Sequence, residues 1–240
     1  MSRPHGVFSR AAFSVGRSLR QSFTLVSSKP AGLSQKLNWR VFVFDALRGC
    51  TSVTSKGHEM ISRNDSGYIL RPSLPEDAQN YARLFDQVNP EVARLTGSAL
   101  HYDCDEVVSF FLANIDDETR RDFLLLDPTS RIIGESVINE IDSKLRSANF
   151  RIGIFDTSSL GCGIGSWAIE QTIDFAFREI GLHRLSLDVF SFNPRAIRAY
   201  EKAGFVREGA LRDAVIDSAT GSYGDDILMS ILESEWREHR

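Results

Sequence analysis

Three glycines at alternate positions, Gly161, Gly163 and Gly165, stand where a strand pattern gives way to a helical one. Glycine allows a sharp backbone turn and keeps side chains out of the space above the loop. Amides in the first turn of a helix have no partner within the helix, and the helix dipole is positive there. The loop therefore predicts an anion site, and most naturally a phosphate site.

The kind of phosphate ligand does not follow from the loop alone. A P-loop requires Gly-Lys-Ser/Thr at its end, and this loop has none. The dinucleotide fingerprint requires glycine at its first, third and sixth positions, but Ser166 occupies the sixth. A glycine-rich turn that binds no ligand remains an alternative at this point.

A second segment that could do chemistry runs from Asn193 to Phe205. Pro194 at the first helical position and Gly204 at the end predict a helix between them. Asn193 and Tyr200 are seven positions apart, so they share one face of this helix about 10 Å apart along its axis. Taken without its flanking residues, Tyr200 is more typical of an aromatic side chain packed against a sheet.

The two segments together resemble the signature segments of the GNAT superfamily of N-acetyltransferases. The glycine loop resembles the first segment, and Asn193-Pro194-Arg195-Ala196-Ile197-Arg198-Ala199-Tyr200-Glu201-Lys202-Ala203-Gly204-Phe205 resembles the second. The resemblance covers about residues 68–234, including the order of elements between the motifs. The Tyr-Glu-Lys-x-Gly-Phe ending and the long tail after it look most like the branch that acetylates ribosomal-protein N-termini.

The resemblance implies an acetyl-CoA-dependent N-acetyltransferase in which an amine attacks the bound thioester directly. It implies that loop groups hold the coenzyme A pyrophosphate, that one strand contacts the pantetheine arm and the thioester oxygen, and that Asn193 also contacts the pantetheine. Tyr200 is implied to protonate the leaving thiolate. The predicted cofactor-binding residues are Ile152, Gly153, Ile154, Gly161, Gly163, Ile164, Gly165, Ser166 and Asn193.

Two carboxylates on one predicted strand, Glu135 and Glu140, are candidates for the base that deprotonates the amine. Their separation is odd, so they face opposite sides of the sheet unless a bulge intervenes. Carboxylates on strands are more often surface groups, and both candidates stay open.

One position departs from the family pattern, because Leu160 stands where the family commonly has Arg or Gln. A catalytically silent acyl-CoA-binding or sensor module is therefore an alternative. The acceptor is also open: a protein N-terminus is favoured, and a small amine such as a polyamine or an aminoglycoside is the alternative.

The elements that must position these residues alternate along the chain as strands and helices. Strands are expected near residues 68–71, 122–126, 131–141, 149–155, 184–190, 205–216 and 225–232. We expect an α/β (α+β) fold: a single GNAT-like domain with a mixed, mostly antiparallel sheet of six or seven strands and helices on both faces.

The composition of the 240 residues, 42% hydrophobic and 25% charged, is ordinary for a globular protein. No apolar run approaches the roughly 18 residues of a membrane span, so we expect no membrane partner. The three cysteines and five histidines show no metal-ligand spacing, and we expect no metal. A monomer or homodimer is expected.

The charge is divided along the chain. Residues 1–44 hold seven basic residues and no acidic one, which leaves 21 basic (28 less 7) against 32 acidic residues from Asp45 on, a net charge of −11. An acidic domain favours a cationic acceptor and disfavours nucleic acid. Residues 1–60 are predicted to be a poorly ordered basic extension rich in serine and arginine. A cytoplasmic protein is expected, or an organellar one if residues 1–44 are a transit peptide.

Overall fold

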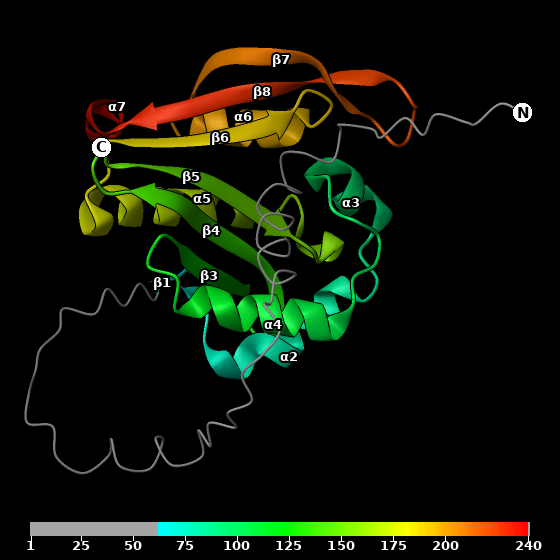
Figure 1. The fold of residues 1–240 in the computed structure, drawn as a ribbon. Coiled ribbons are helices and arrows are strands. Elements are labelled where there is room, and N and C mark those ends of the chain that lie inside the picture. The colour runs from blue at the N-terminus through cyan, green and yellow to red at the C-terminus, as the bar shows by residue number, and fades with distance from the viewer. Residues whose placement is uncertain (1–61, 240) are drawn as a thin grey trace, which may run out of the picture.

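A single sheet of eight strands runs through the part of the chain that the structure, a computed structural model, describes: residues 62–239 (Figure 1). The strands lie in the order β1-β2-β3-β4-β5-β6-β8-β7. Their bounds are β1 Ser62–Arg63, β2 Ile69–Pro72, β3 Arg121–Leu126, β4 Ile132–Asp142, β5 Ser147–Ile154, β6 Arg184–Phe190, β7 Val206–Ile216 and β8 Tyr223–Leu232. The predicted extension over residues 1–60 lies outside the described residues.

The α/β fold with helices on both faces of a mostly antiparallel sheet is confirmed, but the sheet has eight strands where six or seven were predicted. The additional strand is β1, which pairs only Ser62 and Arg63 with β2. Two residues are too few to show the alternation by which a strand is recognised in a sequence.

One pair of neighbouring strands differs from all the others in the sheet. β5 and β6 are parallel, and only three residue pairs join them, Ser147–Asn149 with Arg184–Ser186. Each strand then continues for several residues without the other, β5 to Ile154 and β6 to Phe190. In Figure 1 the two strands lie together near the C-terminus and diverge toward α3 (Pro90–Thr96). The sheet is therefore split from the middle of β5 onward.

Helices cover both faces of the sheet, because alternate side chains of the strands are apolar on each face. On β3, Phe123 and Leu125 pack with α5 (Ile164–Phe175) and α6 (Pro194–Lys202), whereas Leu124 and Leu126 pack with α2 (Ala78–Ala82), α3 and α4 (Cys104–Ile115). α5 continues as a π-helical turn over Ala176–Ile180. The short α7 (Glu233–Glu238) joins the α5 side, where Trp236 stacks on Phe177.

β4 and β5 approach each other closely at Gly134, which pairs with Ile154. A methyl group added at Gly134 would overlap the carbonyl oxygen of Gly153 and lie 3.2 Å from the Cα of Ile154. Both obstacles are backbone, so neither can turn aside as a side chain would. Because Gly134 has no side chain, β4 can pair closely with β5, the strand that borders the split.

We predict that Gly134→Ala lowers the free energy of unfolding by roughly 1–3 kcal/mol, as expected for forcing an extra methyl group into packed structure. The matched control is Gly209→Ala on β7, where an added methyl group meets nothing within 4 Å. Thermal and urea unfolding of both variants measures the difference. Equal stability of the two variants would contradict the close approach.

Candidate active site

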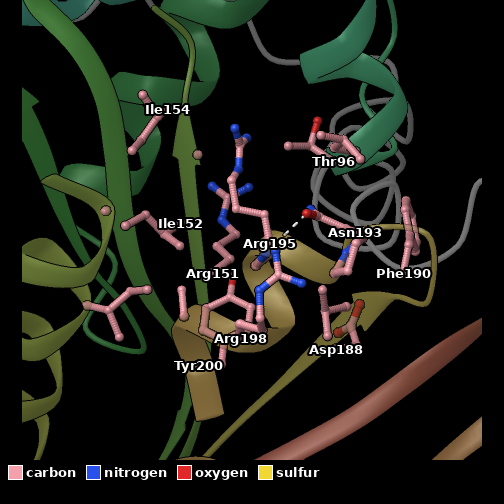
Figure 2. Close-up of a pocket in the computed structure, with 18 of the residues that line it drawn as sticks. Thr96, Arg151, Ile152, Ile154, Asp188, Phe190, Asn193, Arg195, Arg198 and Tyr200 are labelled. Atoms are coloured by element: carbon pink, nitrogen blue, oxygen red, sulfur yellow. Dashed lines mark hydrogen bonds between the residues drawn. The ribbon is translucent and has the colours of Figure 1, made fainter. Parts of the chain in front are cut away.

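The split between β5 and β6 opens into a cavity of about 1520 Å³. Its walls come from both diverging strands, from the loop before α5, from α6, and from α3, β7 and β8 (Figure 2). Beyond Asn149, the edge of β5 that faces β6 has no strand partner in the described chain. Its free backbone groups can therefore pair with an extended ligand as another strand would.

The predicted glycine loop lies at one wall of this cavity. Gly161 and Gly163 adopt φ angles of 83° and 81°, which L-residues with side chains rarely take. A side chain added at either glycine would enter open space. The loop therefore turns as predicted and leaves the approach to the helix free.

The N-terminus of α5 differs from those of the other long helices in having no side-chain cap. α4 is capped by Asp103 and α6 by Asn193, whose side chains accept hydrogen bonds from first-turn amides. Gly163 occupies the cap position of α5 and has no side chain to do so. The first-turn amides, which include those of Ile164, Gly165 and Ser166, are thus available to an anion.

α6 brings the second pair of predicted residues to the same cavity. Asn193 and Tyr200 both line it, and Figure 2 shows them on α6 with Arg195 and Arg198 between them. The Oδ1 atom of Asn193 accepts a hydrogen bond from Ala196 N at 3.2 Å. Asn193 therefore serves as a helix cap whether or not it contacts a ligand.

Tyr200 is packed among aromatic rings but also lines the cavity. Its ring meets Phe150 and Phe205 at centroid distances of 6.3 and 5.8 Å. Its hydroxyl has no hydrogen-bond partner among residues 62–239. Burial raises the pKa of the Tyr200 phenol above its usual range, and the charge of Asp188 adds to the rise. The phenol therefore stays protonated at neutral pH, as a proton donor must.

The two predicted bases lie in different surroundings. Glu135 is buried, accepts a hydrogen bond from the Tyr81 hydroxyl at 2.6 Å and lies 3.3 Å from Arg151 Nη2. It lines a smaller cavity of about 70 Å³ beside the large one. Burial raises the pKa of Tyr81 well above its usual range, and the charge of Glu135 adds to it. Glu135 is thus already committed to two partners.

Glu140 lines the large cavity and is exposed. It adopts a left-handed φ of 54° at a register shift between β4 and β5, after Asn139. The bulge changes the direction that simple alternation predicts for the side chain. The structure thus brings Glu140, and not Glu135, to the cavity that the glycine loop and Tyr200 share.

The charges around the cavity are divided between its walls. One wall, formed by α6, carries three basic residues: Arg195, Arg198 and Lys202. Arg151 of β5, which is paired with Glu135, also lines the cavity. Five carboxylates line the cavity from other elements; they are Glu91 of α3, Glu140 of β4, Asp188 of β6, Asp213 of β7 and Asp226 of β8. Such a division suits a ligand pair of opposite charge.

An ion pair joins α3 to the loop between β7 and β8 beside the cavity. Arg94 Nε and Nη2 donate to the two carboxylate oxygens of Asp217 at 2.5 and 2.9 Å. The hydrogen bond from Arg94 lowers the pKa of Asp217 to about 2. The Arg94 guanidinium also lies 5.1 Å from the centre of the Phe192 ring. These contacts fix α3 relative to the far end of the sheet.

Sequence reasoning did not identify Asp188 or Asp226 as site residues. The strand pattern of Leu185, Leu187 and Val189 does place Asp188 on the opposite face of β6, and that was a usable signal. Asp226 carries no such signal, because its place at the cavity depends on β8 lying next to β6.

Two further observations concern residues 62–239 as a whole. They contain no helix that is both long enough and apolar enough to cross a bilayer. They also contain no group of three or more histidine, cysteine, aspartate or glutamate residues placed to hold a metal ion.

Comparison with known proteins identifies the same region. The model of the acetyltransferase (GNAT) domain family matches residues 68–206. A spermidine N(1)-acetyltransferase from Vibrio cholerae is 33% identical over 132 residues, 55% of this chain and 75% of that protein. One from Escherichia coli strain K12 is 28% identical over 71% of this chain and 89% of that protein.

Solved structures with a similar fold include the same V. cholerae enzyme. A crystal structure of the V. cholerae spermidine N-acetyltransferase in complex with CoA and spermine matches 72% of this chain and 99% of that chain, with a TM-score of 0.64 and 29% identity. Another structure of that enzyme is described as dodecameric. The resemblance to the ribosomal-protein branch is not confirmed by these comparisons. The chain belongs to the GNAT acetyltransferase family and is an N-acetyltransferase that uses acetyl-CoA.

Proposed function

We propose that the protein acetylates a primary amine of a small polycationic acceptor, such as a polyamine. The observation that carries the proposal is the set of five carboxylates around the cavity, at Glu91, Glu140, Asp188, Asp213 and Asp226. Carboxylates attract and hydrogen-bond ammonium groups. The activity named for the V. cholerae and E. coli relatives supports this choice over the protein N-terminus predicted from the sequence.

The residues around the glycine loop suit the coenzyme. The uncapped N-terminus of α5 at Gly163 offers amides to a pyrophosphate, and the basic wall of α6 offers charge to further phosphate groups. Leu160 supplies no cation, but these amides do not depend on the side chain at that position. Acetyl-CoA, when bound, supplies an acetyl group activated as a thioester.

The open edge of β5 suits the extended arm of the coenzyme. Ile152, Gly153 and Ile154 line the cavity beyond the last pair with β6. In this proposal their free backbone groups hold the pantetheine amides and donate an N–H to the thioester oxygen. An N–H held in place before reaction stabilises the negative charge that develops on that oxygen. Asn193 contacts the same arm while capping α6.

Proton transfer is assigned to two residues of the cavity wall. Glu140 takes a proton from the acceptor ammonium through water, because its exposed carboxylate can share a solvent molecule with the acceptor. The neutral amine that results attacks the carbonyl carbon of the thioester. As the C–N bond forms and the C–S bond breaks, Tyr200 gives its phenolic proton to the leaving thiolate and regains a proton from the nitrogen of the new amide. Glu135 instead holds Arg151 and Tyr81 in place and acts as a positioning residue.

A panel of acceptors tests the proposal. Thiol release from acetyl-CoA is followed with spermidine, an aminoglycoside and peptides with free N-termini. We expect turnover with spermidine to exceed that with the peptides. Faster turnover with a peptide would restore the protein N-terminus as the acceptor. Acetyl-CoA binding without turnover on the whole panel would favour the silent acyl-CoA-binding module.

The assembly and the location of the protein are also proposals. The dodecameric structure of the V. cholerae enzyme favours an assembly larger than the predicted monomer or homodimer. Light scattering of the full chain measures its mass. The cytoplasmic location stays a prediction from the sequence.

We predict that Tyr200→Phe lowers kcat by roughly 100-fold or more, the range of general acid catalysis, because it removes the proton donor. Acetyl-CoA affinity should change little, since the aromatic packing is kept. Tyr223→Phe is the matched control, because that hydroxyl belongs to an exposed residue that does not line the cavity. Steady-state kinetics and calorimetric titration separate the two effects. A parallel loss of affinity and kcat would make Tyr200 a structural residue.

We predict that Gly163→Val abolishes acetyl-CoA binding and costs roughly 1–3 kcal/mol of stability from backbone strain. The β-branched side chain restricts the left-handed backbone and fills the approach to the helix amides. The matched control is Gly181→Val at the other end of the same helical segment, where φ is 74° and the space is also open. Titration with acetyl-CoA measures binding, and thermal melts measure stability. A folded variant that binds acetyl-CoA as well as the wild type does would contradict the assignment of this loop as an anion site.

A further inference from the structure

Asp226 is a buried carboxylate with an unsatisfied oxygen. Its residue is 6% exposed, and its Oδ1 atom is buried without a hydrogen-bond partner in the described structure. The same residue lines the large cavity. An uncompensated buried charge is costly, so its retention at a cavity wall points to a ligand that supplies the missing partner.

Asp188 stands beside it on the neighbouring strand. In the β6–β8 pairing, Asp226 lies opposite Phe190 and Asp188 lies opposite Leu228. The two aspartates are therefore diagonal neighbours on one face of the sheet, with Cβ atoms about 7 Å apart or less. Asp188 lines the cavity together with Asn193, Arg198 and Phe190, and Figure 2 shows these side chains. Neither carboxylate has an ion pair within residues 62–239.

We propose that Asp188 and Asp226 together bind a non-reacting ammonium group of the acceptor, and so select amines that carry a second positive charge. The proposal rests on the proposed function and names two of its specificity residues. An ammonium has three N–H donors and can bridge two carboxylates. Mg²⁺ or Ca²⁺ fits less well, because these ions take six or more oxygen ligands.

The two aspartates lie at different distances from the split, because Asp188 is on β6, which borders it, and Asp226 is on β8, one strand farther away. The thioester is expected at the open edge of β5, next to Tyr200, whereas Asp226 lies on β8, two strands away from β5. β6 and β8 are paired and about 4.8 Å apart, so the pair lies within one strand spacing of the split, and a short alkyl chain can reach it from the reacting amine. An acceptor with two amines joined by such a chain can place one at each position.

The electrostatics of the pair agree with a site for a cation. Burial raises the pKa of Asp226 to about 7, and the charge of Asp188 adds to the rise. The other charged groups that line the cavity are three carboxylates and four basic residues: Glu91, Glu140, Asp213, Arg151, Arg195, Arg198 and Lys202. A bound ammonium favours the ionised carboxylate and offsets its repulsion from Asp188.

The test compares spermidine with hexylamine, a monoamine, as acceptors and as ligands of the CoA-loaded full-length protein. For Asp226→Asn we expect KM and Kd for spermidine to rise by roughly tenfold or more, the value of a lost hydrogen bond to a charged group. KM for hexylamine should rise far less. Asp188→Asn should show the same selectivity. Glu170→Gln, which removes an exposed charge of α5 outside the cavity, is the control for general attraction.

Thermal melts of Asp226→Asn test whether the variant folds and how the buried charge affects stability. The folded pKa of Asp226 lies above the unfolded value near 3.9, so the carboxylate lowers stability as pH rises through about 7. Asp226→Asn should therefore raise Tm at pH 8 relative to the wild type, and the difference should shrink at pH 5.

Each outcome bears on the proposal. An equal loss with both amines would assign the pair to the reacting amine, and unchanged spermidine binding in both variants would also overturn the proposal. Calorimetric binding does not depend on turnover. Selective spermidine binding without turnover would therefore keep the subsite and refute the proposed function, whereas no binding of spermidine by the wild type would overturn the subsite.

Discussion

The structure depends on the early separation of two parallel strands. β5 and β6 share three residue pairs and then diverge, although both continue as strands. A strand edge that stays unpaired inside a sheet must find other partners for its backbone groups. The cavity opens at this separation, and elements from both sides of it line the cavity. α5 and α6 begin at its open end, and α3 lies across from them.

In the proposed function, the two walls of the cavity serve different chemistry because they are built from different elements. The coenzyme side offers helix amides and the basic residues of α6, such as Arg195 and Arg198. The acceptor side offers carboxylates from strands and from α3. Tyr200 lies between them. Burial raises the pKa of its phenol, and the negative charge of Asp188 raises it further, so the phenol stays protonated. One cavity that holds both substrates at once is consistent with direct attack by the amine.

The parts of the site with local signals could be predicted from the sequence. Gly161 and Gly163 were expected to turn the loop, and both take left-handed angles that favour glycine. Pro194 and Gly204 mark the ends of α6 because their preferences act over one turn of helix. The apolar alternation of seven strands was also readable, and each of them is present.

The remaining features depend on contacts between segments far apart in the sequence. A strand pattern shows which residues share a face but not which strands become neighbours, so the insertion of β8 between β6 and β7 was not predicted. Asp226 reaches the cavity only through that insertion. The placement of Glu140 depends on a bulge, and the alternation of side chains does not foresee one. Glu135 is held by Tyr81, 54 positions earlier in the chain.

The split also divides the sheet mechanically into two blocks. β1 to β5 form one, β6 with β8 and β7 form the other, and three residue pairs join them within the sheet. A ligand that pairs with the open edge of β5 and touches α6 bridges the blocks where the backbone does not. The binding free energy then adds to the cohesion of the fold by mass action. The stability of the two-block sheet would therefore rise with the concentration of the coenzyme.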